Sequence, residues 1–262
     1  MLIKSGSLDL GQPINWASPL NRGLVSRWQV INQGAYSGGA RLLDLAGKNH
    51  GTLTNGPVWQ GAMGRPGGFG SLKFDGSDDR VDTSLSFNEQ FYTVANWEYV
   101  PSGTSGFRVQ FENLYQFSHY RDGTGFNLAL GNGSLWLTFP SCGTVSTNVW
   151  THFASTYDGA TIKGYINGLE VSSTPYSRSY YASAQVTKIG AAGSNSALSD
   201  GFLDDLRLYS VAKSASEISA IYQDSRRGYP ETLNWQRRTV VFDMGAAPPA
   251  SSLNYLTLLG VG

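Results

Sequence analysis

Short turn sequences set between runs of alternating polar and apolar residues constrain this chain more than any other feature. Asp158-Gly159 and Asn167-Gly168 each stand between two such runs. Because a type I′ hairpin turn needs positive φ at both central residues, these dipeptides are a strong local hairpin signal. Similar glycine-containing turns occur at 121–123 and 131–133. Repeated hairpins predict an all-β, antiparallel sandwich.

One predicted strand runs directly into the clearest helix signal in the chain. Residues 201–209 alternate strictly from Leu206 onward, which is typical of a half-buried strand. Ser214 and Glu217 then have the spacing of a capping box, which opens a helix. The apolar stripe of this helix consists of Ile218, Ile221 and Tyr222.

A strong strand is predicted at 91–100, with the polar residues Asn96 and Glu98 on one of its two faces. In an antiparallel sheet the polar face commonly meets solvent. The opposite face is therefore predicted to point into the core. It consists of Phe91, Thr93, Ala95, Trp97 and Tyr99.

Composition excludes several classes of partner. The 262 residues carry a formal net charge of zero, so bulk electrostatics give no reason to expect nucleic acid. No apolar run approaches the roughly 20 residues that span a bilayer, so no membrane span is expected. The start of the chain shows no basic segment followed by an apolar one, so no ordinary signal peptide is expected. The single cysteine, Cys142, excludes an intrachain disulfide.

The two ends differ from the middle, and three parts are predicted: an arm over 1–22, a sandwich over 23–230 and a tail over 231–262. The tail has a basic pair, a Pro-Pro break and a last apolar, β-prone segment. Such a segment is poorly placed in water. It either completes its own domain as a last strand or pairs with a neighbouring subunit by strand addition. The residues of the tail that are predicted to dock on an assembly are Arg237, Arg238, Phe242, Leu253, Tyr255, Leu256, Leu258 and Leu259.

An ordered set of motifs over about residues 23–225 resembles the laminin-G-like branch of the concanavalin A-like lectin/glucanase superfamily. The main pieces are Phe74-Asp75-Gly76, Trp150-Thr151-His152, Tyr165-Ile166-Asn167-Gly168 and the run 201–209. The resemblance implies a two-sheet jelly-roll sandwich, to which the capping box at Ser214 adds one short C-terminal helix. The terminal arms look similar, more loosely, to those on such domains in bacteriophage and prophage structural proteins.

The superfamily contains glycoside hydrolases, which need two carboxylates flanking the scissile bond. In the sandwich hydrolases this pair occupies alternate positions of one strand, and no glutamate here is followed two residues later by an acid. Asp78-Asp79 and Asp204-Asp205 are adjacent, so in a strand they would point to opposite faces. We therefore predict no catalytic residues and no enzyme activity.

Calcium is the most credible cofactor, because carboxylates in glycine-rich turns supply the oxygen ligands that it prefers. The family resemblance places Asp79 and Asp204 on motifs that lie near an ion, or near a structural hydrogen-bond network, in some relatives. The alternative is that Asp75, Asp78 and Asp79 only cap their own turn through side-chain hydrogen bonds.

Two aromatic stretches are candidates for glycan or partner binding. The first, which leaves a hairpin and is polar for a core strand, contains Tyr176, Arg178, Tyr180 and Tyr181. The second contains Tyr115, Phe117, His119 and Tyr120. Exposed aromatic rings with polar groups around them suit a sugar, but tyrosine-rich loops suit a protein interface equally well.

These observations favour a non-catalytic structural or decoration subunit of a larger assembly, such as a virion. Its partners would be other subunits, either copies of itself or capsid or tail proteins. It would be made in the cytoplasm without a signal peptide and located in the virion or in another extracellular surface assembly. The alternative is a secreted or surface carbohydrate-binding lectin module that recognises a cell-surface glycan, with or without calcium.

Overall fold

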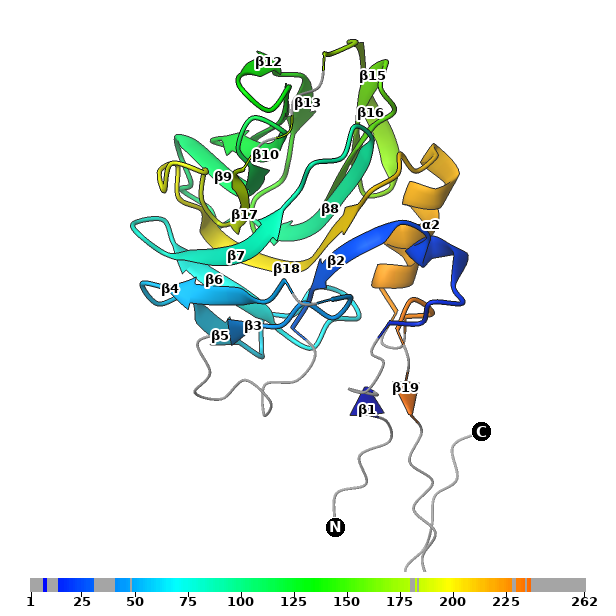
Figure 1. The fold of residues 1–262 in the computed structure, drawn as a ribbon. Helices are drawn as coiled ribbons and strands as arrows, with labels where there is room; N and C mark the ends of the chain where they lie inside the picture. The colour runs from blue at the N-terminus through cyan, green and yellow to red at the C-terminus, as the bar shows by residue number, and fades with distance from the viewer. Residues whose placement is uncertain are drawn as a thin grey trace, which may run out of the picture.

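The chain folds into two antiparallel β-sheets packed face to face, with a helix along one side and a separate two-stranded ribbon below (Figure 1). The computed structural model describes residues 7–8, 14–30, 41–47, 49–179, 182, 184–227, 230–233 and 235–236. The prediction of an all-β, two-sheet jelly-roll sandwich with one short C-terminal helix is confirmed.

The first sheet has eight strands in the order β16-β15-β14-β8-β18-β6-β5, with β2 also paired to β18. Their bounds are β2 (Leu24–Trp28), β5 (Val58–Gln60), β6 (Ser71–Asp75), β8 (Tyr92–Tyr99), β14 (Trp150–Tyr157), β15 (Thr161–Ile166), β16 (Leu169–Pro175) and β18 (Asp200–Tyr209).

The second sheet has nine strands in the order β12-β11-β10-β9-β17-β7-β4-β3, with β13 paired to β11. Their bounds are β3 (Arg41–Leu42), β4 (Gly51–Thr54), β7 (Arg80–Ser86), β9 (Phe107–Asn113), β10 (Phe117–Asp122), β11 (Gly125–Gly131), β12 (Trp136–Thr138), β13 (Ser141–Thr144) and β17 (Val186–Ile189).

The remaining elements lie outside the two sheets. They are the ribbon strands β1 (Ser7–Leu8) and β19 (Trp235–Gln236), the short 3₁₀ helix η1 (Pro19–Asn21) and the helix α2 (Ala215–Ser225). Neither described helix has the length and apolar character that crossing a membrane requires.

The predicted hairpin turns are present where their sequences indicate. Asp158-Gly159 joins β14 to β15, and Asn167-Gly168 joins β15 to β16. Asn167 and Gly168 have φ values of +51° and +79°, so both occupy the left-handed region that a type I′ turn requires. Local sequence therefore fixes this part of the first sheet.

Strand β8 corrects the predicted core face. Tyr92 lies in the main core between the sheets, and Asn96 and Glu98 follow it on the same face of the strand. Asn96 Oδ1 is 2.8 Å from His119 Nδ1, and Arg121 Nε donates to Glu98 Oε1 at 2.6 Å, both partners coming from β10 of the facing sheet. The polar face is interior because its side chains find partners across the sandwich.

Helix α2 covers the opposite face of β8, which explains why apolar residues also lie there. The Ser214 hydroxyl accepts from the Glu217 N–H and the Glu217 carboxylate accepts from the Ser214 N–H, so the predicted capping box is confirmed. The buried cluster beneath the helix consists of Ile218, Ala95, Ala154 and Tyr165. Phe91, which was predicted to belong to the core face, lies at the surface.

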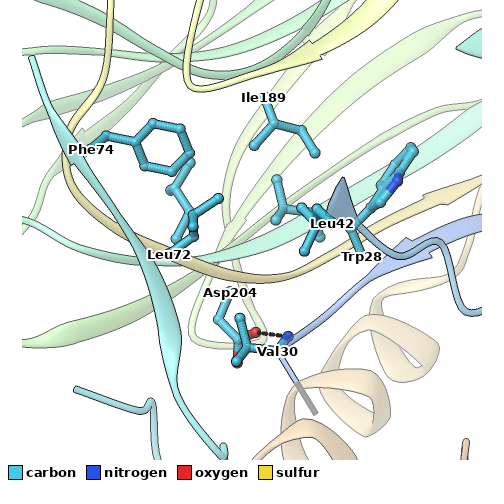
Figure 2. Close-up of a pocket in the computed structure, with 9 residues that line it drawn as sticks. Trp28, Val30, Leu42, Leu72, Phe74, Ile189 and Asp204 are labelled. Atoms are coloured by element: carbon cyan, nitrogen blue, oxygen red, sulfur yellow. Dashed lines mark hydrogen bonds between the residues drawn. The ribbon is translucent and has the colours of Figure 1, made fainter. Parts of the chain in front are cut away.

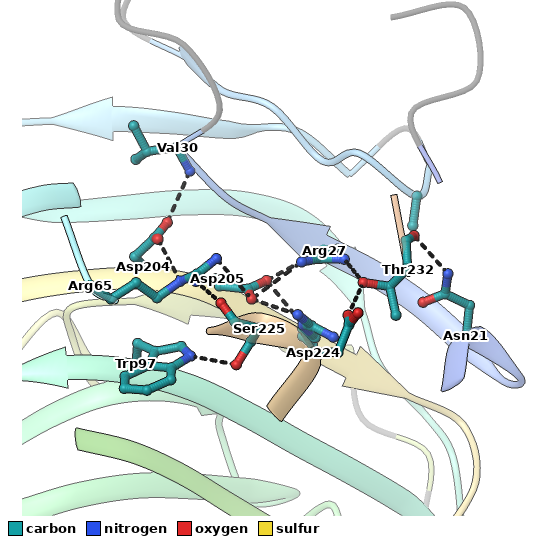
Figure 3. Close-up of polar contacts among 12 residues, drawn as sticks. Asn21, Arg27, Val30, Arg65, Trp97, Asp204, Asp205, Asp224, Ser225 and Thr232 are labelled. Atoms are coloured by element: carbon teal, nitrogen blue, oxygen red, sulfur yellow. Dashed lines mark hydrogen bonds and ion pairs between the residues drawn. The ribbon is translucent and has the colours of Figure 1, made fainter. Parts of the chain in front are cut away.

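A buried network of charges joins β2, β18, the loop before β6 and the segment after α2 (Figure 3). Arg27 Nε donates to Asp205 Oδ1 at 2.8 Å. Arg207 Nη2 donates to Asp205 Oδ2 at 2.6 Å. Arg65 Nε lies 2.8 Å from Asp204 Oδ2, and both side chains of this pair are fully buried. The network therefore ties together segments that are far apart in sequence.

A bulge in β18 explains how two adjacent aspartates enter one network. Arg65 lies within 3.2 Å of both Asp204 and Asp205. The φ of +48° at Asp205, and a shift in the β18–β8 register between Asp204 and Arg207, mark the irregularity. The predicted opposite orientation of these two carboxylates is therefore wrong.

Charge balance in this network depends on the arginines. Burial alone would raise the pKa of Asp205, but Arg207, Arg27 and Arg65 outweigh it and hold that pKa well below its ordinary value. Burial raises the pKa of Asp204 to about 6, because Arg65 offsets only part of the desolvation. Arginine side chains therefore compensate both carboxylates, Asp205 more completely than Asp204.

We expect Arg65→Ala to lower the free energy of unfolding by about 3–5 kcal/mol, because it leaves the buried Asp204 carboxylate without its cationic partner. Urea denaturation at pH 7 measures the change. The matched control is Lys163→Ala, which breaks the half-exposed pair between Lys163 and Glu170 and should cost about 1 kcal/mol or less. Equal, small losses in the two variants would show that the network does not stabilise the fold.

Candidate functional site

An open pocket of about 350 Å³, lined largely by aromatic and other apolar side chains, lies on the outward face of the second sheet. Phe111, Phe117 and Leu128 point from this sheet into the core, so their strand neighbours Glu112, Ser118 and Ala129 face outward. The full lining is Phe107, Glu112, Leu114, Tyr115, Ser118, Tyr120, Ala129, Trp136, Phe139, Ala192, Ser194, Ser196 and Ala197.

The turn between β9 and β10 places Tyr115 at the pocket. Tyr115 has a φ of +62°, which is uncommon for an aromatic residue and is tolerated only where surrounding contacts hold it. Its carbonyl oxygen accepts from the Gly133 N–H at 2.7 Å, and the Gly131 N–H donates to Gln116 O at 3.1 Å. A Cβ at Gly131 would overlap the Tyr115 carbonyl, so this close approach needs glycine.

Aromatic rings form two groups in the pocket. Phe107 and Tyr120 lie with ring centroids 4.7 Å apart. Trp136 contacts Tyr115 edge to face at 5.7 Å and Phe139 at 6.4 Å. Phe107 and Phe139 are about half exposed, at 50% and 56%. The pocket therefore presents apolar rings to solvent, a feature that marks binding surfaces.

A single acid, Glu112, lies among the described residues that line this pocket. It is only 4% exposed, and its Oε1 accepts from the Gly193 N–H at 2.7 Å. Burial raises the pKa of Glu112 above its ordinary value, and the Gly193 N–H offsets part of that shift. A Cβ on Gly193 would stand 2.6 Å from Leu114 Cβ, so the close approach of this N–H also depends on glycine.

A second cavity, between the two sheets, is structural (Figure 2). Apolar side chains including Trp28, Leu72 and Phe74 line it, and it is too narrow to admit a water molecule. Asp204 lies at its edge and accepts from the Val30 N–H at 3.0 Å. This cavity has no room for a ligand and belongs to the core.

The structure divides the second aromatic stretch predicted from sequence. Tyr115 and Tyr120 line the pocket. Phe117 and His119 are buried between the sheets. His119 Nε2 lies 2.7 Å from Ser155 Oγ, and burial lowers the pKa of this histidine to about 3.

The first aromatic stretch is in part interior. Arg178 is buried, its guanidinium lies 4.8 Å from the centroid of the Tyr157 ring, and it donates to the Gly131 carbonyl. This contact supports the turn that precedes Trp136 rather than presenting a charge to solvent. Tyr176 is half-buried against the main core.

Some predicted residues lie outside the described part of the chain. They are Tyr180 and Tyr181 of the first aromatic stretch and the predicted docking residues of the tail, Arg237, Arg238, Phe242, Leu253, Tyr255, Leu256, Leu258 and Leu259.

The two predicted calcium ligands have different surroundings. Asp204 is ion-paired with Arg65 in the buried network. Asp79 belongs instead to a cluster with Asp75 and Asp78, in which carboxylate oxygens lie within 4.8 Å of one another. Asp75 Oδ1 accepts from the Ser77 N–H at 2.8 Å, as expected for carboxylates that cap their turn. Burial and the charge of Asp75 raise the pKa of Asp79.

If the three turn aspartates bind calcium, adding about 1 mM Ca²⁺ to the metal-free protein should raise the melting temperature, because a ligand of the native state stabilises it. Asp79→Asn should abolish the shift, and Mg²⁺ should not reproduce it. Differential scanning calorimetry in chelator and in calcium measures the effect. Identical melting curves would mean that these residues act only as turn caps.

Sequence reasoning missed the residues that complete the pocket: Phe107, Glu112, Trp136 and Phe139. A weak signal was available, because Trp136 and Phe139 follow the glycine-rich turn 131–133 in a run that also contains exposed Leu135. Glu112 gave no local signal, because only sheet pairing places it opposite Ser118 on the pocket floor.

Comparison with known proteins identifies one family model. The model described as concanavalin A-like lectin/glucanases superfamily matches residues 75–219, more than half of the chain. No curated protein sequence matches.

Three solved structures illustrate the similarity of fold. Domain 4 of the extracellular GH43 arabinanase AbnA from Geobacillus stearothermophilus, in complex with arabinotriose, aligns with a TM-score of 0.55 and 18% identity, over 76% of this chain and 98% of that one. The botulinum neurotoxin type G receptor binding domain aligns with a TM-score of 0.59 and 14% identity, over 77% of this chain and 51% of that one.

The third structure is of botulinum neurotoxin type C, whose cell entry depends on interaction with two ganglioside molecules. It aligns with a TM-score of 0.56 and 13% identity, over 79% of this chain and 52% of that one. The chain thus spans about half the length of the toxin structures it matches and nearly the whole of the arabinanase domain.

Proposed function

The chain belongs to the concanavalin A-like lectin/glucanases superfamily, and we propose that it is a glycan-binding module whose site is the aromatic pocket on β9, β10, β11 and β12. The observation that carries the proposal is the combination of exposed rings with one buried carboxylate in one open pocket. Solved structures of the same fold that contain arabinotriose or interact with gangliosides support it.

The pocket has the two kinds of group that a sugar needs. Apolar C–H faces of a pyranose or furanose ring pack on aromatic faces such as Trp136 and Tyr120. Sugar hydroxyls donate hydrogen bonds to a carboxylate such as Glu112 and exchange bonds with serine hydroxyls such as Ser194 and Ser196. The rings supply contact area and the polar groups orient the ligand.

Binding without hydrolysis is part of the proposal. The two-carboxylate mechanism requires a second acid across the scissile bond. Within the described lining of the pocket, Glu112 is the single carboxylate. A glycan bound there would meet one carboxylate and no acid–base pair.

Trp136→Ala should raise the Kd for a bound oligosaccharide about 30-fold, equivalent to about 2 kcal/mol, because a central aromatic anchor carries much of the binding energy. Isothermal titration calorimetry with a ligand found on a glycan array gives the value. The matched control is Trp16→Ala, since Trp16 is 55% exposed and lies outside the pocket lining. Unchanged affinity in Trp136→Ala would move the site elsewhere.

A second candidate function, docking into an assembly such as a virion, is favoured by the terminal segments. Ser7–Leu8 pairs with Trp235–Gln236, and Ile14 forms a bridge with Leu233, so the two ends run together as a ribbon. Figure 1 shows this ribbon at the opposite end of the molecule from β12. An anchored ribbon would leave the pocket directed outward, so the two functions are compatible.

Deleting residues 248–262 distinguishes the two roles predicted for the tail. If the tail docks on another subunit, light scattering should show a lower assembly mass while the melting temperature stays unchanged. If the tail is the last strand of its own domain, the melting temperature should fall and the mass should not change. In either case glycan affinity should be retained, because the pocket does not include these residues.

A further inference from the structure

We propose that the pocket selects its glycans by charge, accepting neutral or amino sugars and rejecting sugars that carry a carboxylate. This inference rests on the proposed glycan-binding function. Its basis is the position of Glu112 on the pocket floor and the absence of a cation from the described lining.

Among the described residues, no positively charged side chain pairs with Glu112. Its Oε1 accepts from the Gly193 N–H at 2.7 Å, and this N–H and the Ser118 side chain lower its pKa against the effect of burial. Its cross-strand neighbours are Ser118 on β10 and Lys188 on β17. Lys188 does not neutralise it, because its ammonium lies 2.8 Å from Asp82 Oδ1 and also donates to Asn195.

The other groups around the carboxylate do not supply positive charge either. The loop that carries Gly193 contributes Ser194 and Ser196, whose hydroxyls lie 2.7 Å from each other. The remaining titratable side chains of the described lining are the tyrosines Tyr115 and Tyr120, and burial raises the pKa of Tyr120. A ligand in the pocket therefore meets one negative charge at most, with no guanidinium or ammonium to pair with an acidic sugar.

This arrangement discriminates between glycans through one contact. A hydroxyl or ammonium group of a sugar donates to the carboxylate, and such charge-assisted bonds are stronger than neutral ones. A uronic or sialic carboxylate at the same place would put two negative charges together in a partly desolvated site, which is strongly unfavourable. The repulsion of an acidic sugar is present while Glu112 is ionised. Because burial raises the pKa of Glu112, this repulsion weakens as the pH falls and the carboxylate becomes neutral.

The test uses the full chain on an array of matched oligosaccharides, in which each neutral glycan stands beside the same glycan carrying one carboxylate. We expect the neutral member to bind at least about tenfold more tightly at pH 8. Glu112→Gln, which keeps an oxygen to accept from Gly193, should reduce that ratio to near one. The control is Glu170→Gln, because Glu170 is an acid on the first sheet that pairs with Lys163. This substitution should leave the neutral-to-acidic ratio unchanged.

A second measurement does not depend on the variant folding: in the wild-type protein the neutral-to-acidic ratio should shrink between pH 8 and pH 5. Acidic glycans that bind as tightly as their neutral counterparts would overturn the charge selection while leaving glycan binding in place. Failure of every glycan on the array would instead overturn the proposed function, and the charge selection with it.

Discussion

The buried network of arginine and aspartate side chains is the interaction on which the rest of the structure depends. It contains Arg27, Arg65 and Arg207 with Asp204 and Asp205, all nearly inaccessible to solvent. The Asp224 carboxylate at the end of α2 accepts from the Thr232 hydroxyl, which itself accepts from Arg27. Strand, loop, helix and C-terminal segment therefore meet at one set of charges (Figure 3). Buried pairs seldom add net stability over apolar packing, but they penalise any arrangement that separates them. The network thus favours one placement of α2 on the sheet over all others.

Features set by local rules were predictable from the sequence, and features set by long-range pairing were not. The turns at Asn167-Gly168 and the capping box at Ser214 depend on neighbouring residues only, and both are confirmed. The core face of β8 was predicted wrongly because Glu98 looks like a solvent residue until Arg121 is found across the sandwich. The orientation of Asp204 and Asp205 failed for a related reason, since alternation assumes a regular strand and β18 has a bulge there.

The candidate site was predicted in part for the same physical reasons. Tyr115 and Tyr120 were identified because an aromatic cluster beside a turn is visible in the sequence. Their combination with Trp136 arises only when β12 folds back onto β11 and the tight turn at Gly131 admits the Tyr115 carbonyl. Arg178 shows the opposite case: the sequence indicated a binding group, whereas the structure places its guanidinium among interior carbonyls, where it supports the same turn. Residues beneath a site and residues within it can look alike in a sequence.

Glu112 differs from the other buried carboxylates of this protein in the partners that compensate its charge. Asp205 is surrounded by arginines, and Glu98 is paired with Arg121. Asp44, which has no such cation, accepts hydrogen bonds from Ser26, Arg27, Ala46 and Asn49. Glu112 is as buried as Asp44, but its Oε1 accepts from the Gly193 N–H and, within the described residues, no cation pairs with it; it also lines a pocket. A buried carboxylate without a cationic partner reduces stability unless hydrogen bonds compensate it. The position of Glu112 beside two groups of aromatic rings makes a hydrogen-bond donor on a bound ligand a favourable further partner for this carboxylate, which is the basis of the proposed site.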